Sequence, residues 1–140
     1  MSTPSAPVAL AAGDAMPAAS VGPITRTDIV RYAGAGGDFN PIHHDEPFAV
    51  SLGLPGVFAM GMLQGGALAQ RLAAWVGPEH VRTFNLRFTG QVWPGDVLAI
   101  EGTVSGVADG IAQLTLTATR QTGDVVLKAT ASATAAPADS

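Results

Sequence analysis

The hydrophobic pattern of this chain changes its period once, and that change limits the folds open to it. The segment MGMLQGGALAQRLAAWV, from Met60 to Val76, is apolar on nearly all helical faces, which predicts a buried helix. Its paired glycines, Gly65 and Gly66, predict the close approach of another backbone. Apolar and polar side chains then alternate in four runs that predict strands, at 84–89, 97–107, 112–120 and 125–134. One helix followed by an antiparallel meander predicts an α+β domain whose sheet wraps the helix.

Cap and turn residues predict shorter elements before this helix. A short strand is expected near 20–24. Thr27 followed by Asp28 predicts a helix that ends at about residue 32 or 33, where the sequence AGAGG begins. Asp45 is a candidate N-cap for a further short helix over 46–52.

The length of 140 residues suits a single domain. We expect this domain to cover residues 20–135, between a flexible Ala- and Pro-rich leader at 1–19 and a flexible tail at 136–140. The leader has no Lys or Arg and no continuous apolar stretch, so it does not look like a signal peptide. The chain has no Cys, which excludes disulfides and thiol chemistry and favours a cytoplasmic protein.

Charge and hydropathy argue against two kinds of partner. The formal net charge is −4 and the 7 basic residues are scattered along the chain, so we expect no nucleic-acid partner. The segment 60–76 is too short to span a membrane and is interrupted by Gln64, Gln70 and Arg71. We therefore expect no membrane partner.

The nine residues GDFNPIHHD, from Gly37 to Asp45, are the strongest candidate for a site. Only 13% of the residues are charged and there are 3 histidines, yet this loop places two adjacent histidines between two aspartates. Asp38 and His43 are candidates for an acid and base pair that activates water, and the amide of Asn40 could hold a partner in place. The same spacing suits an Asx turn with solvated histidines, and the residues alone leave both interpretations open.

A metal site is the weaker hypothesis for this loop. Asp38, His43, His44 and Asp45 all have ligand side chains, but His80 is the only other histidine and no zinc motif such as HExxH occurs. We expect no metal. The chain also lacks a GxGxxG or Walker-type loop, so we expect no redox or nucleotide cofactor.

Three segments resemble one protein family. The sequence YAGAGGDFNPIHHD (32–45) resembles the hydratase-2 signature of the MaoC-like (R)-specific enoyl-CoA hydratases and 3-hydroxyacyl-thioester dehydratases. The sequence GLPGVFAMGML (53–63) is similar to the family's entry into its central helix, and FNLRFTGQVWPGDVL (84–98) is similar to its characteristic strand and turn. The resemblance covers most of the chain, from about residue 23 to 135. It implies a hot-dog fold, in which an antiparallel sheet wraps a central helix, usually in a dimer.

The resemblance also implies roles for single residues. Asp38 and His43 match the pair that holds and activates the water added to the substrate double bond, and Asn40 matches the residue that orders their loop. Gly61 matches the glycine whose backbone N–H binds the thioester carbonyl, a task that suits a helix N-terminus. Many relatives have His before this glycine, where this chain has Met60. Four apolar residues are candidates for the wall of an acyl pocket: Val57, Phe58, Met60 and Met62.

The implied activity is the reversible hydration of trans-2-enoyl thioesters of coenzyme A or acyl carrier protein to (R)-3-hydroxyacyl thioesters. We expect a homodimer. An alternative is that the chain is the catalytic subunit of a heteromeric hydratase that needs a partner chain. A further alternative is an acyl-CoA thioesterase, because thioesterases share the hot-dog scaffold. The predicted helix at 60–76 has no Asp or Glu to attack or activate water, which favours the hydratase.

Overall fold

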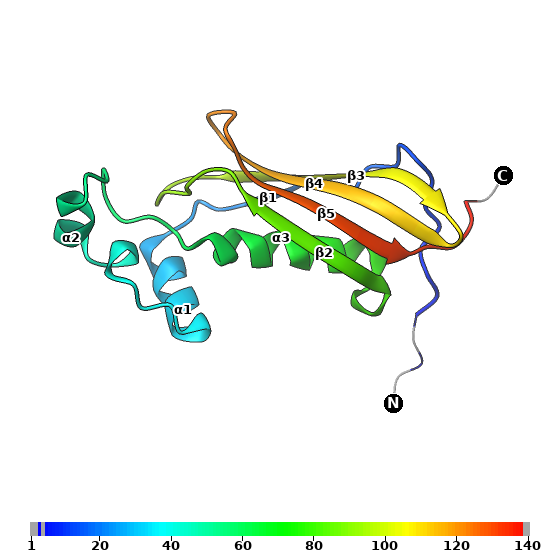
Figure 1. The fold of residues 1–140 in the computed structure, drawn as a ribbon, viewed down its shortest axis with the longest axis horizontal. Helices are drawn as coiled ribbons and strands as arrows, with labels where there is room; N and C mark the ends of the chain where they lie inside the picture. Colours follow the sequence, from blue (N-terminus) through cyan, green and yellow to red (C-terminus); the bar gives the residue numbers. More distant parts are fainter. Residues whose placement is uncertain (1–2, 4, 139–140) are drawn as a thin grey trace.

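A long helix lies along one face of a five-stranded sheet in the computed structural model, which describes residues 3 and 5–138 (Figure 1). The strands are β1 (Ala19–Val21), β2 (Val81–Phe88), β3 (Leu98–Ala108), β4 (Ile111–Arg120) and β5 (Val125–Thr134). The helices are α1 (Arg26–Gly36), α2 (Glu46–Ser51), α3 (Gly61–Val76) and the 3-10 turns η1 (Pro41–His43) and η2 (Pro78–His80). The α+β class, the long helix and the four main strands predicted from the sequence are confirmed.

The strands are antiparallel and lie in the order β1-β3-β4-β5-β2. Strand β2 pairs with β5 and not with β3, the next strand in the chain. The predicted meander is therefore right for β3, β4 and β5 and wrong for β2. The connection at 89–97 is no hairpin, since Val92 is fully buried in it and its carbonyl accepts a hydrogen bond from the N–H of Ala59 at 2.8 Å. This connection carries the chain past the start of α3 to β3, which lies next to the edge strand β1 on the other side of the sheet.

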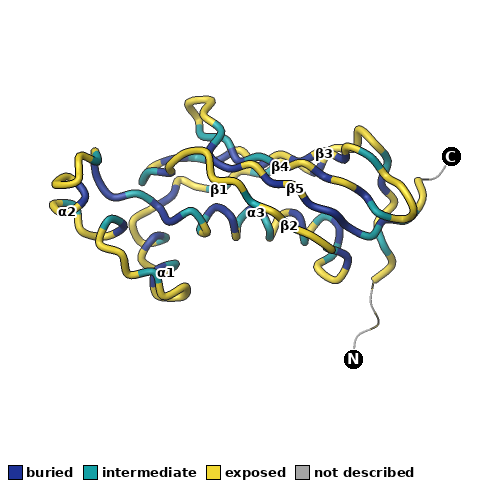
Figure 2. The backbone as a smooth tube through the Cα atoms, viewed as in Figure 1, coloured by how far each residue is buried: buried dark blue, intermediate teal, exposed yellow. Residues whose placement is uncertain are grey.

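The core lies between the sheet and one face of α3 (Figure 2). Exposure alternates along the central strands, so that Leu98 and Ile100 on β3 and Leu114 and Leu116 on β4 are at most 1% exposed. Opposite them, α3 buries Gln64, Gly65, Leu68, Leu72 and Val76. Burial of these large aliphatic side chains provides most of the driving force for folding. Within the described part of the chain, no helix combines the length and the hydrophobicity needed to cross a bilayer.

Helix α3 is buried on one face only, whereas the sequence predicts burial all round. Met62 is 46% exposed, and a Cβ added to Gly66 would meet nothing within 4 Å. A Cβ on Gly65 would meet the side chain of Leu86 at 3.0 Å, so neither glycine serves the close approach of another backbone. The sequence pattern misleads here because Ala and Gly count as apolar but have little surface to bury.

Helix α1 differs from its prediction at both ends. Its N-cap is Thr25 and not Thr27, because Thr25 and Asp28 form a capping box in which each side chain accepts a hydrogen bond from the other's backbone N–H. The helix then continues to Gly36 and ends where Gly37 adopts a left-handed conformation at φ 71°. The predicted Asp45 cap of α2 is confirmed, since its Oδ1 accepts from the N–H of Phe48 at 3.1 Å.

The segment before β1 packs against the sheet, where the sequence predicts a flexible leader. Leu10 and Met16 are 3% and 5% exposed, and the N–H groups of Gly13 and Met16 donate to carbonyls of β3 at 2.8 and 2.9 Å. These bonds continue the edge of β3 beyond its short pairing with β1, which explains why so Ala-rich a segment lies in place. Residues 1, 2 and 4 of the predicted leader and residues 139–140 of the predicted tail lie outside the described residues.

Candidate active site

The loop at 37–45 holds His43 in a buried position. The side chain of His43 is 7% exposed, and its Nδ1 lies 2.6 Å from the carbonyl oxygen of Phe58. A carbonyl oxygen can only accept, so the neutral ring carries its proton on Nδ1 and leaves Nε2 as an acceptor. The ring of Phe58 meets the imidazole edge-on, with the centroids 5.0 Å apart. These two contacts fix the orientation of the histidine.

Asp38 faces the free nitrogen of this histidine. Its Oδ2 lies 3.6 Å from Nε2 of His43, and its side chain is 43% exposed. A separation of 3.6 Å is too long for a direct hydrogen bond but allows the two groups to share a water molecule. The structure therefore brings together the two residues that the loop motif singled out.

The Asx turn coexists with this pair, although the sequence presented the two as alternatives. Oδ1 of Asn40 accepts from the N–H of Ile42 at 3.1 Å and caps η1, the turn that carries His43. The N–H of Asn40 lies 3.3 Å from Oδ1 of Asp38. Asn40 thus fixes the backbone between the acid and the histidine. By contrast, His44 is exposed and Asp45 caps α2, so both serve the local backbone.

The N-terminus of α3 faces this loop. Its N-cap residue, Met60, makes no side-chain hydrogen bond to the first turn, so the helix dipole at this end is not satisfied by a capping side chain. Gly61 begins the helix, and a Cβ added there would lie 2.8 Å from the ring of Phe88. The glycine therefore lets an aromatic side chain from β2 approach the start of the helix.

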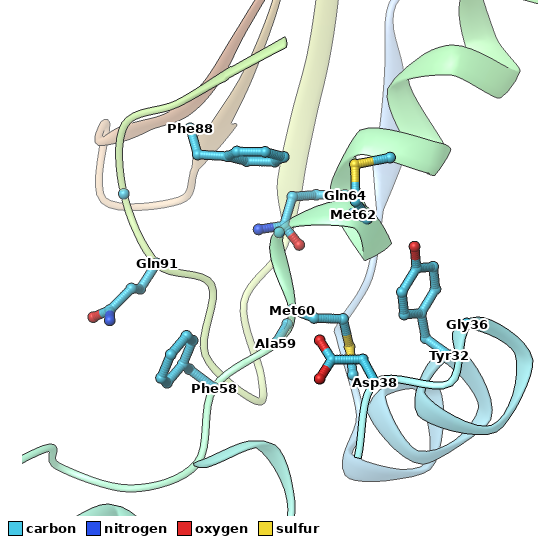
Figure 3. Close-up of a pocket in the computed structure, with 12 residues that line it drawn as sticks. Tyr32, Gly36, Asp38, Phe58, Ala59, Met60, Met62, Gln64, Phe88 and Gln91 are labelled. Carbon is cyan, nitrogen blue, oxygen red and sulfur yellow. The ribbon is translucent and has the colours of Figure 1, made fainter. Parts of the chain in front are cut away.

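A cavity of about 480 Å³ lies between the loop and the start of α3 (Figure 3). Asp38 borders it on the loop side and Gly61 on the helix side. Three of the four candidate acyl-pocket residues, Phe58, Met60 and Met62, are also among its lining residues. The fourth, Val57, is 2% exposed and borders a different hollow beside Trp93. Four further side chains line the cavity without having been singled out from the sequence: Tyr32, Gln64, Phe88 and Gln91.

Of these four residues, Gln64 carries the clearest signal in the sequence. It stands three residues after Gly61 and is the one polar residue on the buried face of α3. A polar side chain at a core-facing position of an apolar helix is the sequence signal that marks it.

An ion pair next to the site holds the turn at 93–96. Nε and Nη2 of Arg120 donate to the two carboxylate oxygens of Asp96 at 2.7 and 3.1 Å, and the N–H of Trp93 donates to the same carboxylate at 2.8 Å. Burial raises the pKa of Asp96, but the hydrogen bonds from Arg120, Trp93 and Gln121 outweigh it and hold the pKa below its ordinary value. This turn supports the ring of Trp93, which packs edge-on against Phe58.

The described residues contain no group of three or more His, Cys, Asp or Glu arranged for a metal ion. His80 is far from the loop in sequence and its Nε2 donates to the carbonyl of Ser5 at 2.8 Å. The cavity itself is bordered by the Asp38 carboxylate and the positive end of α3, and the His43 imidazole lies 3.6 Å from that carboxylate.

The family model for the MaoC like domain matches residues 10–126. The chain belongs to the MaoC-like dehydratase family. The MaoC-like chain superposes on (R)-hydratase PhaJ1 from Pseudomonas aeruginosa with a TM-score of 0.81 and 27% identity, over 93% of this chain and 84% of that one. It also matches the ChsH1–ChsH2 complex from Mycobacterium tuberculosis with a TM-score of 0.80 and 25% identity, over 89% and 98% of the two chains. The hot-dog fold implied by the sequence motifs is confirmed.

A curated relative shows the same domain within a much longer protein. The MaoC-like chain is 35% identical over 97 residues to the fatty acid synthase beta subunit pkiC of Emericella nidulans. The match takes in 66% of this chain and 5% of that subunit. The chain thus spans about a twentieth of the length of this relative.

Proposed function

We propose that this chain is a hydro-lyase that reversibly adds water to trans-2-enoyl thioesters and forms (R)-3-hydroxyacyl thioesters. The observation that carries the proposal is the position of Asp38 across one cavity from Gly61 at the N-terminus of α3, with Nε2 of His43 3.6 Å from the Asp38 carboxylate. One side of this cavity can handle water and the other can bind a carbonyl oxygen. Hydration of a double bond conjugated to a thioester needs both.

The helix end stabilises the negative charge that the reaction creates. When water attacks C3, the electrons of the double bond move toward the thioester carbonyl, whose oxygen gains charge. In this proposal the N–H of Gly61, the first residue of α3, donates a hydrogen bond to that oxygen. A comparable backbone or side-chain donor lowers an oxyanion barrier by about 3 kcal/mol.

The loop handles the water and its proton. The water donates one O–H to the pair formed by the carboxylate of Asp38 and Nε2 of His43, whose facing atoms are 3.6 Å apart. This pair accepts one proton as the C3–O bond forms and supplies a proton to C2, which completes the addition. The hydrogen bond from Nδ1 of His43 to the Phe58 carbonyl keeps Nε2 directed at the water.

The names of two similar solved structures bear on the activity and assembly of this chain. PhaJ1 is named as an (R)-hydratase, and ChsH1–ChsH2 is named as a complex. We propose that this chain acts as a homodimer on thioesters of coenzyme A or acyl carrier protein, and that the exposed face of α3 with Met62 lies near the partner. The alternative is the catalytic subunit of a heteromeric hydratase, since this chain contains the whole Asp38, Asn40 and His43 set.

The test is hydration by the purified chain. Crotonyl-CoA and a longer trans-2-enoyl-CoA are supplied, loss of the conjugated double bond is followed by absorbance, and the product's configuration is determined by chiral chromatography. The expected product is the (R)-3-hydroxyacyl thioester, from a protein whose mass in solution is that of a dimer. Release of free thiol with an intact double bond would establish a thioesterase instead. A folded, inactive homodimer would favour the obligate partner chain.

A further inference from the structure

Gln64 carries a buried polar atom that the protein does not satisfy. Its side chain is 1% exposed, and within the described part of the chain Oε1 has no hydrogen-bond partner. Buried polar groups are almost always paired, because leaving one unpaired costs its full desolvation penalty. Gln64 therefore needs a hydrogen-bond donor that comes from outside the chain.

The missing donor has to enter from the cavity. Gln64 lines it, and its amide and the carboxylate of Asp38 both point into the space between α3 and the loop (Figure 3). Gln64 follows Gly61 by three positions, so both lie on one face of the helix. Helical side chains also lean toward the N-terminus. This geometry brings the amide toward the end of the helix where the thioester carbonyl would bind.

The chemistry of the proposed reaction limits which group can be the donor. At the reacting end of the substrate, a thioester carbonyl only accepts hydrogen bonds and a hydrocarbon acyl chain offers none, while the nearest amide N–H of a pantetheine carrier lies two CH2 groups beyond the sulfur. The O–H groups at the reacting carbons belong to the incoming water and, after addition, to the 3-hydroxyl. We propose that Oε1 of Gln64 accepts the hydrogen bond of this O–H group; the inference rests on the proposed function and adds a residue to its site.

The hydrogen bond to Gln64 persists from the bound water to the product, because the addition removes only one of the two protons of the water. Water has two O–H bonds, one of which loses its proton to the Asp38 and His43 pair as the C3–O bond forms. The second O–H donates to Gln64 throughout and becomes the 3-hydroxyl of the product. Water that donates one O–H to the Asp38 and His43 pair and the other to Gln64 has a fixed position relative to C3, which directs addition to one face.

The first experiment compares stability with activity in Gln64→Met. Methionine is close to glutamine in size and removes the amide, so we expect an unchanged or higher melting temperature, because the unpaired buried group is gone. Hydration of crotonyl-CoA should fall roughly tenfold in kcat/KM, the size of one hydrogen bond inside a protein. Gln70→Met makes the same change at an exposed position of α3 and should alter neither quantity. A lower melting temperature or a changed mass in solution for Gln64→Met would overturn the inference, since Gln64 would then serve the fold or the dimer.

The second experiment measures binding without turnover. Asp38→Asn protein, with and without Gln64→Met, is titrated with (R)-3-hydroxybutyryl-CoA and with butyryl-CoA, which lacks the hydroxyl. Loss of Gln64 should weaken the hydroxy ligand roughly tenfold and butyryl-CoA less than about twofold. Equal weakening of the two ligands, or none, would overturn the inference.

The two proposals can fail separately. If wild-type protein hydrates no enoyl thioester, the proposed function fails, and the binding comparison still decides whether Gln64 recognises a hydroxyl. If wild-type protein is active and Gln64→Met is equally active, only the role of Gln64 fails.

Discussion

Nδ1 of His43 lies 2.6 Å from the carbonyl oxygen of Phe58, a residue 15 positions away that borders the cavity. This bond joins the loop at 37–45 to the chain segment that leads into α3, so it connects the two halves of the proposed site. The orientation of the imidazole, and the choice of Nε2 as its reactive nitrogen, depend on this contact.

Asp38→Asn and His43→Gln should each lower the turnover of an enoyl thioester by about two orders of magnitude or more, because each removes a group that exchanges a proton. Circular dichroism and melting curves should show folded proteins. His44→Gln is the matched control, because His44 is exposed and its Nε2 lies 3.3 Å from the carbonyl oxygen of Phe39. Equal loss from His44→Gln, with full activity in His43→Gln, would show that the catalytic histidine is His44.

Asn40→Ala should lower kcat by about tenfold or more while both His43 and Asp38 remain. The substitution removes the acceptor for the N–H of Ile42, which costs about 1 kcal/mol at a cap and loosens the turn that aims His43. Asn40→Asp keeps an acceptor at this position and should retain more activity than Asn40→Ala. If both variants were equally impaired, the amide group and not the cap would be the essential part.

Gly61→Ala should reduce kcat/KM by between about 10-fold and 100-fold, because its Cβ would lie 2.8 Å from the ring of Phe88 and would displace groups at the reacting end of the cavity. The N–H of residue 61 survives this change. The double variant Gly61→Ala with Phe88→Leu should therefore recover part of the activity. No recovery would mean that the added methyl group blocks the substrate itself.

Asp96→Asn should lower the free energy of unfolding at pH 7 by about 2–4 kcal/mol, because it leaves the guanidinium of Arg120 without its buried carboxylate. The folded-state pKa of Asp96 is lowered, so its stabilising contribution is present above the ordinary aspartate pKa of 3.8 and is lost as the pH falls through the lower folded-state value. The stability difference between wild type and variant should therefore shrink in urea titrations at pH 3.

Asp124→Asn is the control for this ion pair. The Asp124 carboxylate also meets Arg120, at 3.4 Å, but is 67% exposed. Solvent screens such a pair, so the variant should change stability by no more than about 0.5 kcal/mol. A loss as large as that of Asp96→Asn would contradict the assignment of the buried pair as the support of the turn.

Lys128→Glu should stabilise the fold by about 0.5 kcal/mol. Lys128 on β5 lies directly opposite Arg87 on β2, and like charges at paired positions of neighbouring strands repel. Lys128→Thr removes the repulsion without adding attraction and should lie between wild type and Lys128→Glu in urea unfolding. If the stabilities of wild type, Lys128→Thr and Lys128→Glu did not follow the charge at position 128, solvent would screen the pair completely.

The sequence predicted those parts of the fold that depend on periodicity and those parts of the site that depend on a local motif. Alternation fixed which side of β3 and β4 is buried, and the spacing in GDFNPIHHD brought Asp38, Asn40 and His43 together because nine residues of turn cannot separate them far. Pairing of β2 with β5 was not predictable from these patterns, because it depends on the path of the buried connection around Val92.

The residues missed at the site come from segments far apart in the chain. Phe88 reaches Gly61 only because β2 lies at the sheet edge beside α3, and Tyr32 borders the cavity from α1, which the loop at 37–45 separates from α3 in the sequence. Gln64 carried a signal in the sequence, a polar residue among the apolar positions of a buried helix. That signal indicates a role only once the neighbouring side chains are known to leave its oxygen unpaired.

Ala9 and Ala136 form a bridge near the two ends of the described chain. The entry and exit points of this domain therefore lie side by side, at the end of the sheet away from the cavity (Figure 1). A unit with adjoining ends can be inserted into a loop of a larger polypeptide without pulling its strands apart. For the same reason, a circular permutant that joins these ends with a short linker and opens the hairpin at Gly123 should retain both the sheet and the cavity.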